Sequence, residues 1–251
     1  MSSLLTALIV DDERLARLEL RRLLAAHPRI EILGEAPNAE EARAALAELD
    51  PQLLFLDVQM PGETGFDLLA SLDRVPLVVF TTAYDDYALK AFEVSALDYL
   101  VKPIEPARLS RTVERLLQSP AADSARTAED EEPETRGPPP LQPHHRVFLR
   151  DGDRCWFVEL RQVRLFESAD NYTQVHLAGE SPLILRSLNE LEAKLDPRFF
   201  FRANRSQIMN LNEVESIDPW FGGRLMAKVR GGHEVVLSRR RSREFRERMS
   251  V

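Results

Sequence analysis

Three acidic side chains follow short apolar segments in the first half of the chain. Asp11 and Asp12 come directly after one such segment, and Asp57 comes directly after another. If these segments are neighbouring strands of a parallel sheet, their carboxyl ends bring the three carboxylates into one crevice. Converging carboxylates repel each other, and a bound cation resolves the repulsion. Oxygen ligands combined with phosphate chemistry favour Mg²⁺ as that cation.

A lysine and a hydroxyl occupy equivalent positions after two later apolar segments. Thr82 follows one of them, and Lys102 ends the other. An ammonium group and a hydroxyl around one carboxylate would neutralise charge on an incoming phosphoryl group. Taken alone, each residue has an ordinary explanation, since an Asp-Asp pair before a helix is commonly an N-cap. The conjunction of all five, each at a segment end, favours a functional site.

The elements that position these residues alternate between strand and helix. Five apolar runs predict buried strands at residues 7–10, 30–33, 53–56, 77–80 and 99–101. Leucine-rich and alanine-rich helical patterns separate them; Asn38 is expected to cap one helix and Pro106 to open the last. This order predicts an α/β doubly wound parallel five-stranded domain over residues 1–118.

A change of composition divides the chain. Residues 119–143 are rich in Pro, Ala, Glu and Asp, with almost nothing apolar to bury, so we expect a disordered linker there. Residues 144–251 are predicted to form a mostly β domain. Asp151-Gly152 between two apolar runs indicates a hairpin, and Ser187 with Glu190 predicts a capping box on one helix.

Charge is distributed unevenly between the two halves, although the chain as a whole carries −8. Residues 1–120 hold 12 Lys and Arg against 20 Asp and Glu, whereas residues 144–251 hold 19 against 15. An acidic front and a basic rear indicate different partners for the two domains.

The remaining composition argues for a cytoplasmic protein without a membrane partner. No apolar run approaches the roughly 18 residues that span a bilayer. The first residues lack the basic segment and cleavage site of a signal peptide. Cys155 is the single cysteine, which excludes an intrachain disulfide and fits a reducing compartment.

Arginines and polar loop residues of the rear domain are candidates for contacts with nucleic acid. Arg pairs with guanine and Asn with adenine through two hydrogen bonds each, although Asn in a loop is also common turn chemistry. We expect Arg205 and Arg239 to read bases, and Arg243 and Arg246, three apart on one helix face, to hold phosphates. The other candidates are Asn171, Tyr172, Thr173 and Asn204.

The front half resembles CheY-like receiver domains. The resembling blocks are Val10-Asp11-Asp12, Leu56 to Gly62, Thr81-Thr82-Ala83 and Asp98 to Pro103. The resemblance implies that Asp57 is the phosphoacceptor and that Asp11, Asp12 and the Gln59 backbone carbonyl join it in the metal site. It also implies Lys102 as counter-ion, Thr82 as switch hydroxyl and Tyr99 as switch aromatic, with a cis Lys102–Pro103 bond.

The rear half resembles LytTR-type DNA-binding domains. The resembling blocks are Phe166 to Tyr172, Ser187 to Glu192, Phe200 to Asn210 and Val236 to Arg239. The resemblance implies that loops and a short terminal helix enter DNA grooves, with contacts at Asn171 to Thr173, Asn204, Arg205 and Arg239. Family members commonly have His where this chain has Asn204.

These features together predict a response regulator phosphorylated by a sensor histidine kinase and acting on double-stranded promoter DNA. Because the linker is a flexible tether, we expect phosphorylation to favour a homodimer rather than a rigid clamp. An enzyme of the phosphatase kind is disfavoured, since Gln59 stands where a second acid would be needed two residues after Asp57. The alternative function is a receiver that controls an RNA- or protein-binding module.

Overall fold

The computed structural model describes residues 4–83, 98–118 and 139–249. The chain divides into two compact units, residues 1–136 with 153–157 and residues 137–152 with 158–251. Most of the predicted linker, residues 119–138, lies outside the described residues. Among the described helices, none is long and apolar enough to cross a membrane.

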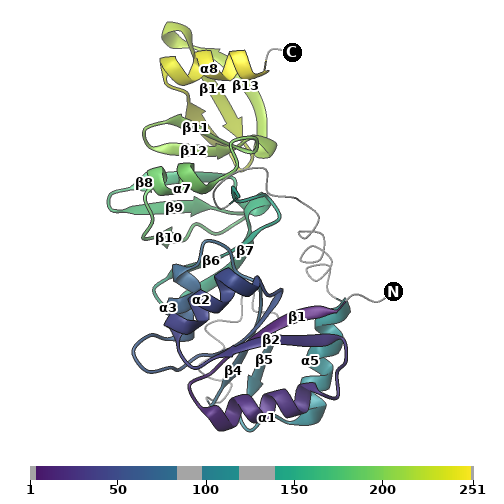
Figure 1. Ribbon diagram of the computed structural model, residues 1–251. Coiled ribbons are helices and arrows are strands. Elements are labelled where there is room, and N and C mark those ends of the chain that lie inside the picture. Colours follow the sequence, from purple (N-terminus) through teal and green to yellow (C-terminus); the bar gives the residue numbers. More distant parts are fainter. Residues whose placement is uncertain (1–3, 84–97, 119–138, 250–251) are drawn as a thin grey trace. The chain divides into compact units, whose positions relative to one another are not determined.

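The first unit is built on a five-stranded parallel sheet, as predicted (Figure 1). Its spatial order is β2-β1-β3-β4-β5, so β1 and β3, whose carboxyl ends carry the acidic residues, are direct neighbours. Every residue of β3 is buried, as expected for a strand covered on both faces. The strands are β1 (Leu5–Val10), β2 (Ile30–Ala36), β3 (Leu53–Asp57), β4 (Leu77–Thr82) and β5 (Asp98–Val101).

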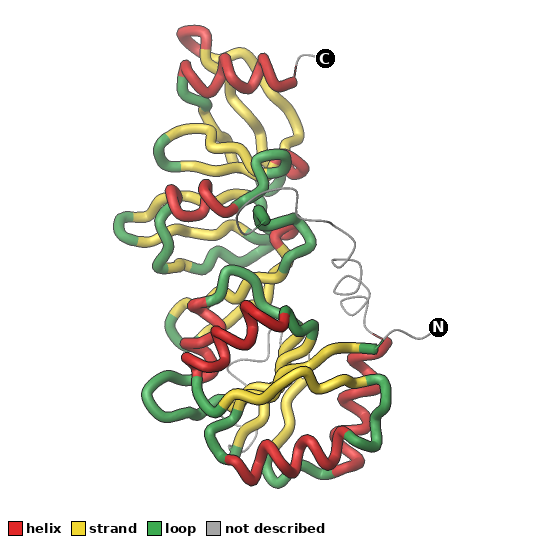
Figure 2. The backbone as a smooth tube through the Cα atoms, viewed as in Figure 1, coloured by secondary structure: helices red, strands yellow, loops and turns green. Residues whose placement is uncertain are grey.

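Helices cover both faces of this sheet (Figure 2). Side chains alternate along β4: Val79 joins the core formed with α1 and α5, while the Phe80 ring lies 5.0 Å from that of Phe66 on α3. The predicted caps are present, since the Asn38 side chain accepts from the Glu41 amide and Pro106 opens α5. The helices are α1 (Arg14–Leu24), α2 (Ala39–Leu49), α3 (Gly65–Ser71) and α5 (Pro106–Gln118).

The second unit is mostly β, again as predicted. One antiparallel sheet has the order β10-β9-β8-β12-β11, and a second has the order β13-β14-β15. The strands are β8 (Leu165–Ala169), β9 (Tyr172–His176), β10 (Leu183–Ile184), β11 (Phe200–Asn204), β12 (Gln207–Asn210), β13 (Val214–Trp220), β14 (Arg224–Val229) and β15 (His233–Val236).

Two of these strands depend on their place in the sheet. β11 is Phe-Phe-Arg-Ala-Asn, and its pairing with β12 along a short hairpin is what makes it a strand. β13 contains Pro219, which has no amide hydrogen to donate. The proline is tolerated because β13 is an edge strand.

Short helices complete this unit. Helix α7 (Leu188–Lys194) has the predicted capping box, with Ser187 and Glu190 satisfying each other's backbone amides. Helix α8 (Arg239–Met249) packs Phe245 into a core with Phe201, Leu225 and other apolar residues of β11 and β14. Three single-turn 3₁₀ helices are η3 (Leu160–Gln162), η4 (Leu211–Glu213) and η5 (Phe221–Gly223).

The start of the rear domain lies before the predicted boundary at residue 144. Leu141 is buried, its amide donates to the Lys194 carbonyl at 2.7 Å, and its carbonyl accepts from the Asp196 amide. The last residues of the expected linker are therefore ordered, because Leu141 supplies an apolar anchor within a polar segment. The predicted hairpin follows as β6 (Arg146–Asp151) and β7 (Arg154–Glu159).

Candidate functional site

The acidic residues converge at the carboxyl ends of β1 and β3. Carboxylate oxygens of Asp11, Asp12 and Asp57 all lie within 4.8 Å of one another. Asp11 and Asp57 are buried, whereas Asp12 is exposed. The convergence follows from the strand order, because neighbouring parallel strands end at the same edge of the sheet.

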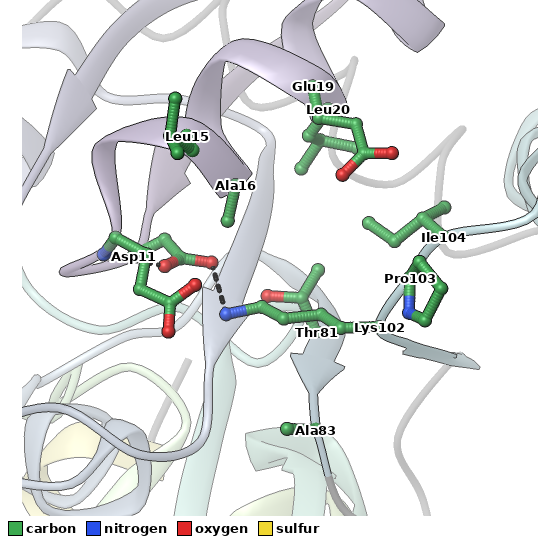
Figure 3. Close-up of a pocket in the computed structure, with 11 residues that line it drawn as sticks. Asp11, Leu15, Ala16, Glu19, Leu20, Thr81, Ala83, Lys102, Pro103 and Ile104 are labelled. Carbon is green, nitrogen blue, oxygen red and sulfur yellow. Dashed lines mark hydrogen bonds and ion pairs between the residues drawn. The ribbon is translucent and has the colours of Figure 1, made fainter.

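Lys102 bridges the two buried carboxylates. Its Nζ lies 2.8 Å from Asp11 Oδ2 and 2.8 Å from Asp57 Oδ2, and Figure 3 shows the first of these contacts. The lysine follows β5 directly, and its amide donates to the Thr82 carbonyl at 2.7 Å. The Lys102–Pro103 peptide is cis, as the resemblance to receiver domains implied.

Burial and charge act in opposite directions on this cluster. Burial raises the pKa of Asp57 above its ordinary value, although the Lys102 ammonium partly offsets the effect and nearby Asp11 adds to it. For Lys102, burial alone would lower the pKa, but hydrogen bonds to Asp11 and Asp57 outweigh it and raise the pKa. The lysine therefore stays charged, and a further cation beside Asp57 would favour its ionised form by opposing the effect of burial.

Arg17 holds the backbone that carries the first two acids. Its Nη1 donates to the Asp11 carbonyl at 2.7 Å, and its Nε pairs with Glu35 at 3.1 Å. Burial would raise the pKa of Glu35, but hydrogen bonds from Arg21 and Arg17 lower it overall. This positioning role had no signal in the sequence, because it depends on α1 lying across the end of β2.

Gly65 is a second positioning residue that the sequence did not indicate. It opens α3 directly beside β3, and its amide donates to the Val58 carbonyl at 2.9 Å. A Cβ at this position would lie 2.3 Å from the Asp57 carbonyl oxygen and 3.0 Å from Leu56 Cγ. Only glycine permits this close approach of helix and strand.

We expect Gly65→Ala to displace Asp57. Overpacking of this kind costs about 1–3 kcal/mol of stability, and phosphorylation by a small acyl phosphate should slow at least tenfold. Denaturant unfolding and intact-mass labelling measure the two effects. Gly179→Ala is the control for a loss of stability far from Asp57, because the new Cβ meets nothing within 4 Å but the left-handed φ of 86° strains the backbone. Labelling of Gly65→Ala at the wild-type rate would contradict the positioning role.

The predicted switch residues lie on the adjacent strands. Thr82 is buried at the end of β4, and its neighbour Thr81 is in register with Asp57. Tyr99 is half-buried on β5, with the Arg108 guanidinium 5.2 Å from its ring centre. The amide of Gln59 donates to Asp57 Oδ1 at 3.2 Å, so this residue adjoins the cluster through its backbone. Their roles in switching and metal binding stay predictions.

Asp98 fixes the strand that carries Tyr99 and Lys102. This buried carboxylate accepts hydrogen bonds from Thr112 at 2.5 Å, from Arg108 at 2.8 Å and from Arg115, all on α5. In the sequence, Asp98 is part of a receiver-like block but has no predicted role. Its partners show that it joins β5 to α5.

In the rear domain, the loops predicted to contact DNA lie at one edge. The β8–β9 turn and the β11–β12 turn are joined by the Ser168 amide, which donates to the Ser206 carbonyl at 2.8 Å. The start of α8 is joined to β11 by the Ser238 amide, which donates to the Ala203 carbonyl at 2.9 Å. The two turns and the start of α8 lie on the left side of the second unit in Figure 1.

Thr173 is buried, which argues against its predicted contact with DNA. Its side chain is 1% exposed, and its hydroxyl donates to the Arg186 carbonyl at 2.5 Å. Thr173 is the second residue of β9, so strand alternation turns it inward, whereas Asn171 and Tyr172 are exposed at the turn.

The carboxamide of Asn204 already makes four hydrogen bonds within the protein, which argues against the predicted base contact. Its Oδ1 accepts from the Ser206 amide at 2.8 Å and the Ser206 hydroxyl at 3.0 Å. Its Nδ2 donates to Gln207 Oε1 at 2.8 Å and to the Val236 carbonyl at 2.9 Å. Contact with a base would break these bonds, so the residue shapes the loop that presents Arg205.

The candidate arginines differ in what they contact within the protein. Arg205, Arg239 and Arg243 are exposed and form no ion pair with other described residues. Arg246 is exposed and donates to the Gly223 carbonyl at 3.2 Å. Arg241, by contrast, forms ion pairs with Glu192 and Glu244. The candidate cations that α8 exposes are therefore Arg239, Arg243 and Arg246.

Comparison with known families agrees with this division. The model of the response regulator receiver domain matches residues 7–114, and that of the LytTr DNA-binding domain matches residues 153–250. A receiver sheet with this acidic cluster, followed by a LytTr domain, defines a two-component response regulator that controls transcription.

Relatives match nearly the whole chain. It is 36% identical to the sensory transduction protein LytT of Enterococcus faecalis, over 97% of this chain and 98% of that protein. It is 35% identical to the transcriptional regulatory protein BtsR of Salmonella typhi, over 99% and 100% of the two chains. The chain belongs to the LytTR family of two-component response regulators.

Solved structures match each unit separately. The response regulatory domain of MrkE from Klebsiella pneumoniae is 31% identical, with a TM-score of 0.41, and the match covers 45% of this chain and 96% of that one. A LytTr DNA-binding domain from Bacillus cereus is 26% identical, with a TM-score of 0.40, over 42% of this chain and 97% of that one.

Proposed function

We propose that Asp57 accepts a phosphoryl group from a sensor histidine kinase and that phosphorylation favours a homodimer on promoter DNA. The observation that carries the proposal is the convergence of Asp11, Asp12 and Asp57 within 4.8 Å, with Lys102 2.8 Å from two of them. The protein is then a cytoplasmic regulator whose chemistry is its own phosphorylation, rather than an enzyme acting on other substrates.

The donor set fits Mg²⁺. Three carboxylates and one ammonium leave a net charge of −2, which one divalent cation neutralises. All ligands are hard oxygens, the class that Mg²⁺ prefers. Asp11, Asp12, Asp57 and the Gln59 carbonyl would hold the ion, and the bound ion supplies positive charge beside the transferred phosphoryl group.

The protein's own groups complete the chemistry. An Asp57 carboxylate oxygen forms a bond to phosphorus as the phosphorus–nitrogen bond of the donor imidazole breaks, and the imidazole leaves with its electron pair. Lys102 would turn from the carboxylates to the phosphoryl oxygens. Thr82 would donate its hydroxyl to the same group, and Tyr99 would follow Thr82 inward, changing the surface near β5.

A pocket beside the acids offers a route for the kinase. It is lined by Asp11, Lys102 and Pro103 together with residues of α1, and Figure 3 shows Leu15 and Ala16 among the lining residues. Leu15 is 78% exposed. An apolar rim around a charged centre suits docking of another protein that must deliver a phosphoryl group.

Binding to duplex DNA tests the proposal directly. The full chain, treated with acetyl phosphate and Mg²⁺, is titrated against a duplex enriched from a random-sequence pool. We expect phosphorylation to tighten binding at least tenfold and to make it cooperative, because dimerisation raises effective concentration. Preference for single-stranded RNA, or for no nucleic acid, would favour the alternative of an RNA- or protein-binding module.

Two arginines should act differently on DNA. Arg239→Ala is expected to cost about 1–3 kcal/mol and to relax preference at one base pair. Arg246→Ala should weaken all duplexes alike and make the salt slope shallower by about one unit. Titration against the enriched and a scrambled duplex at several salt concentrations separates the effects. If Arg246→Ala erases discrimination while Arg239→Ala does not, the two roles are reversed.

A further inference from the structure

Two large aromatic side chains stand in solvent at the β13–β14 turn. Phe221 is 87% exposed, and Trp220 beside it is 44% exposed. Single exposed apolar residues are common on soluble proteins. An adjacent aromatic pair at the tip of a hairpin is a concentrated apolar surface, and such surfaces mark sites of interaction.

The tip is held rigidly against α8. Gly222 and Gly223 have φ of 68° and 75°, a left-handed backbone that favours glycine. A Cβ on Gly222 would lie 3.3 Å from Arg239 Nη2. Arg224 Nε donates to the Phe221 carbonyl at 3.1 Å, and Arg246 donates to the Gly223 carbonyl. The aromatic pair is therefore presented on a fixed turn bordered by guanidinium groups.

Charge and position indicate the partner of this tip. Arg224 and Arg239, which border it, form no ion pair among the residues that the structure describes. Arg239 lies between the tip and the Arg205 loop, because the Ser238 amide donates to the Ala203 carbonyl next to that loop. A long polyanion that contacts Arg205 and Arg239 would therefore also reach Trp220 and Phe221.

We propose that Phe221, supported by Trp220, inserts against a base step of the bound duplex from the minor groove, beyond the bases that Arg205 and Arg239 contact. The inference rests on the proposed DNA binding. Apolar wedges flanked by arginines are how proteins unstack and bend a duplex from that groove. Insertion would add affinity that depends on how easily the step deforms rather than on hydrogen bonds to its bases.

The test places 2-aminopurine at successive positions of the enriched duplex and titrates the phosphorylated full chain. Binding of the wild-type protein should raise 2-aminopurine fluorescence at one base step, because unstacking the probe from its neighbouring bases relieves their quenching of it. Phe221→Ala should lose that signal and bind about tenfold more weakly, with an unchanged salt slope since no charge is removed. Phe221→Trp should retain both the fluorescence rise and the wild-type affinity. Leu185→Ala, which removes a 79% exposed apolar side chain from the same unit away from the tip, should behave as wild type.

The outcomes separate this inference from the proposed function. Wild type that enriches no duplex would overturn both. Wild type that binds, with Phe221→Ala matching it in fluorescence and affinity, would overturn the wedge and leave DNA binding intact. Weaker binding by Phe221→Ala with no fluorescent step in wild type, accompanied by loss of the dimer in sedimentation, would assign the tip to a second copy of the chain instead. Circular dichroism verifies that the variants fold.

Discussion

Asp57→Asn is expected to abolish labelling by a small acyl phosphate. Asparagine keeps the size of the side chain but has no anionic oxygen to attack phosphorus, and Asp57 is the buried acid that touches both Lys102 and the Gln59 amide. Intact-mass measurement should show the mass of one phosphoryl group on the wild type and none on the variant. A chelator should abolish labelling of the wild type as well, because the cluster then lacks its divalent cation.

The matched control for this prediction is Asp50→Asn. Asp50 is an exposed aspartate that ends α2 in a left-handed conformation, which asparagine tolerates. It lies outside the acidic cluster, so labelling should be normal. Equal labelling of Asp57→Asn and wild type would show that another residue is the acceptor.

Lys102→Met should destabilise the receiver domain in Mg²⁺-free buffer by about 3 kcal/mol, because it leaves two buried carboxylates without their shared cation. Without the ammonium, the pKa of Asp57, already raised by burial, should rise further. Carboxyls with raised pKa values in the folded state contribute stability at low pH and lose it as pH rises. The loss in Lys102→Met should therefore be larger at pH 8 than at pH 5.

Calorimetric unfolding at several pH values measures this loss, with and without Mg²⁺. Millimolar Mg²⁺ should restore much of the stability, since it supplies the missing charge. Phosphorylated Lys102→Met should nevertheless remain monomeric in sedimentation, because no ammonium contacts the phosphoryl group. Lys228→Met, a half-exposed lysine of β14, controls for losing a charge. A variant as stable as wild type at pH 8 without Mg²⁺ would refute the bridging role.

The acidic site could be predicted because its geometry follows from strand order. Asp11 and Asp57 end neighbouring parallel strands, and that adjacency alone brings them together. Gly65 and Arg17 could not be predicted, since their roles depend on how closely α3 approaches β3 and how α1 crosses the end of β2. Such distances arise from packing between segments far apart in the sequence.

The rear domain was predicted less completely for a related reason. A polar residue near a turn can face solvent or fold back onto the backbone, and its type does not distinguish the two. Tyr172 and Thr173 are adjacent, yet one is exposed and the other buried, because the first residue of β9 sets the alternation. Asn204 is in a loop that its own carboxamide closes.

Hydrogen bonds between the turns of the second unit and the start of α8 affect how operator preference can evolve. The β8–β9 turn, the β11–β12 turn and the start of α8 are tied through Ser206, Ala203 and Val236. Groups fixed before binding lose little conformational entropy when they meet a ligand. Under the proposed DNA binding, exchanging exposed side chains such as Arg205 or Tyr172 would change the preferred operator without moving this framework. Substituting Asn204, for example by the His that family members commonly have there, would therefore shift the two turns and the start of α8 together.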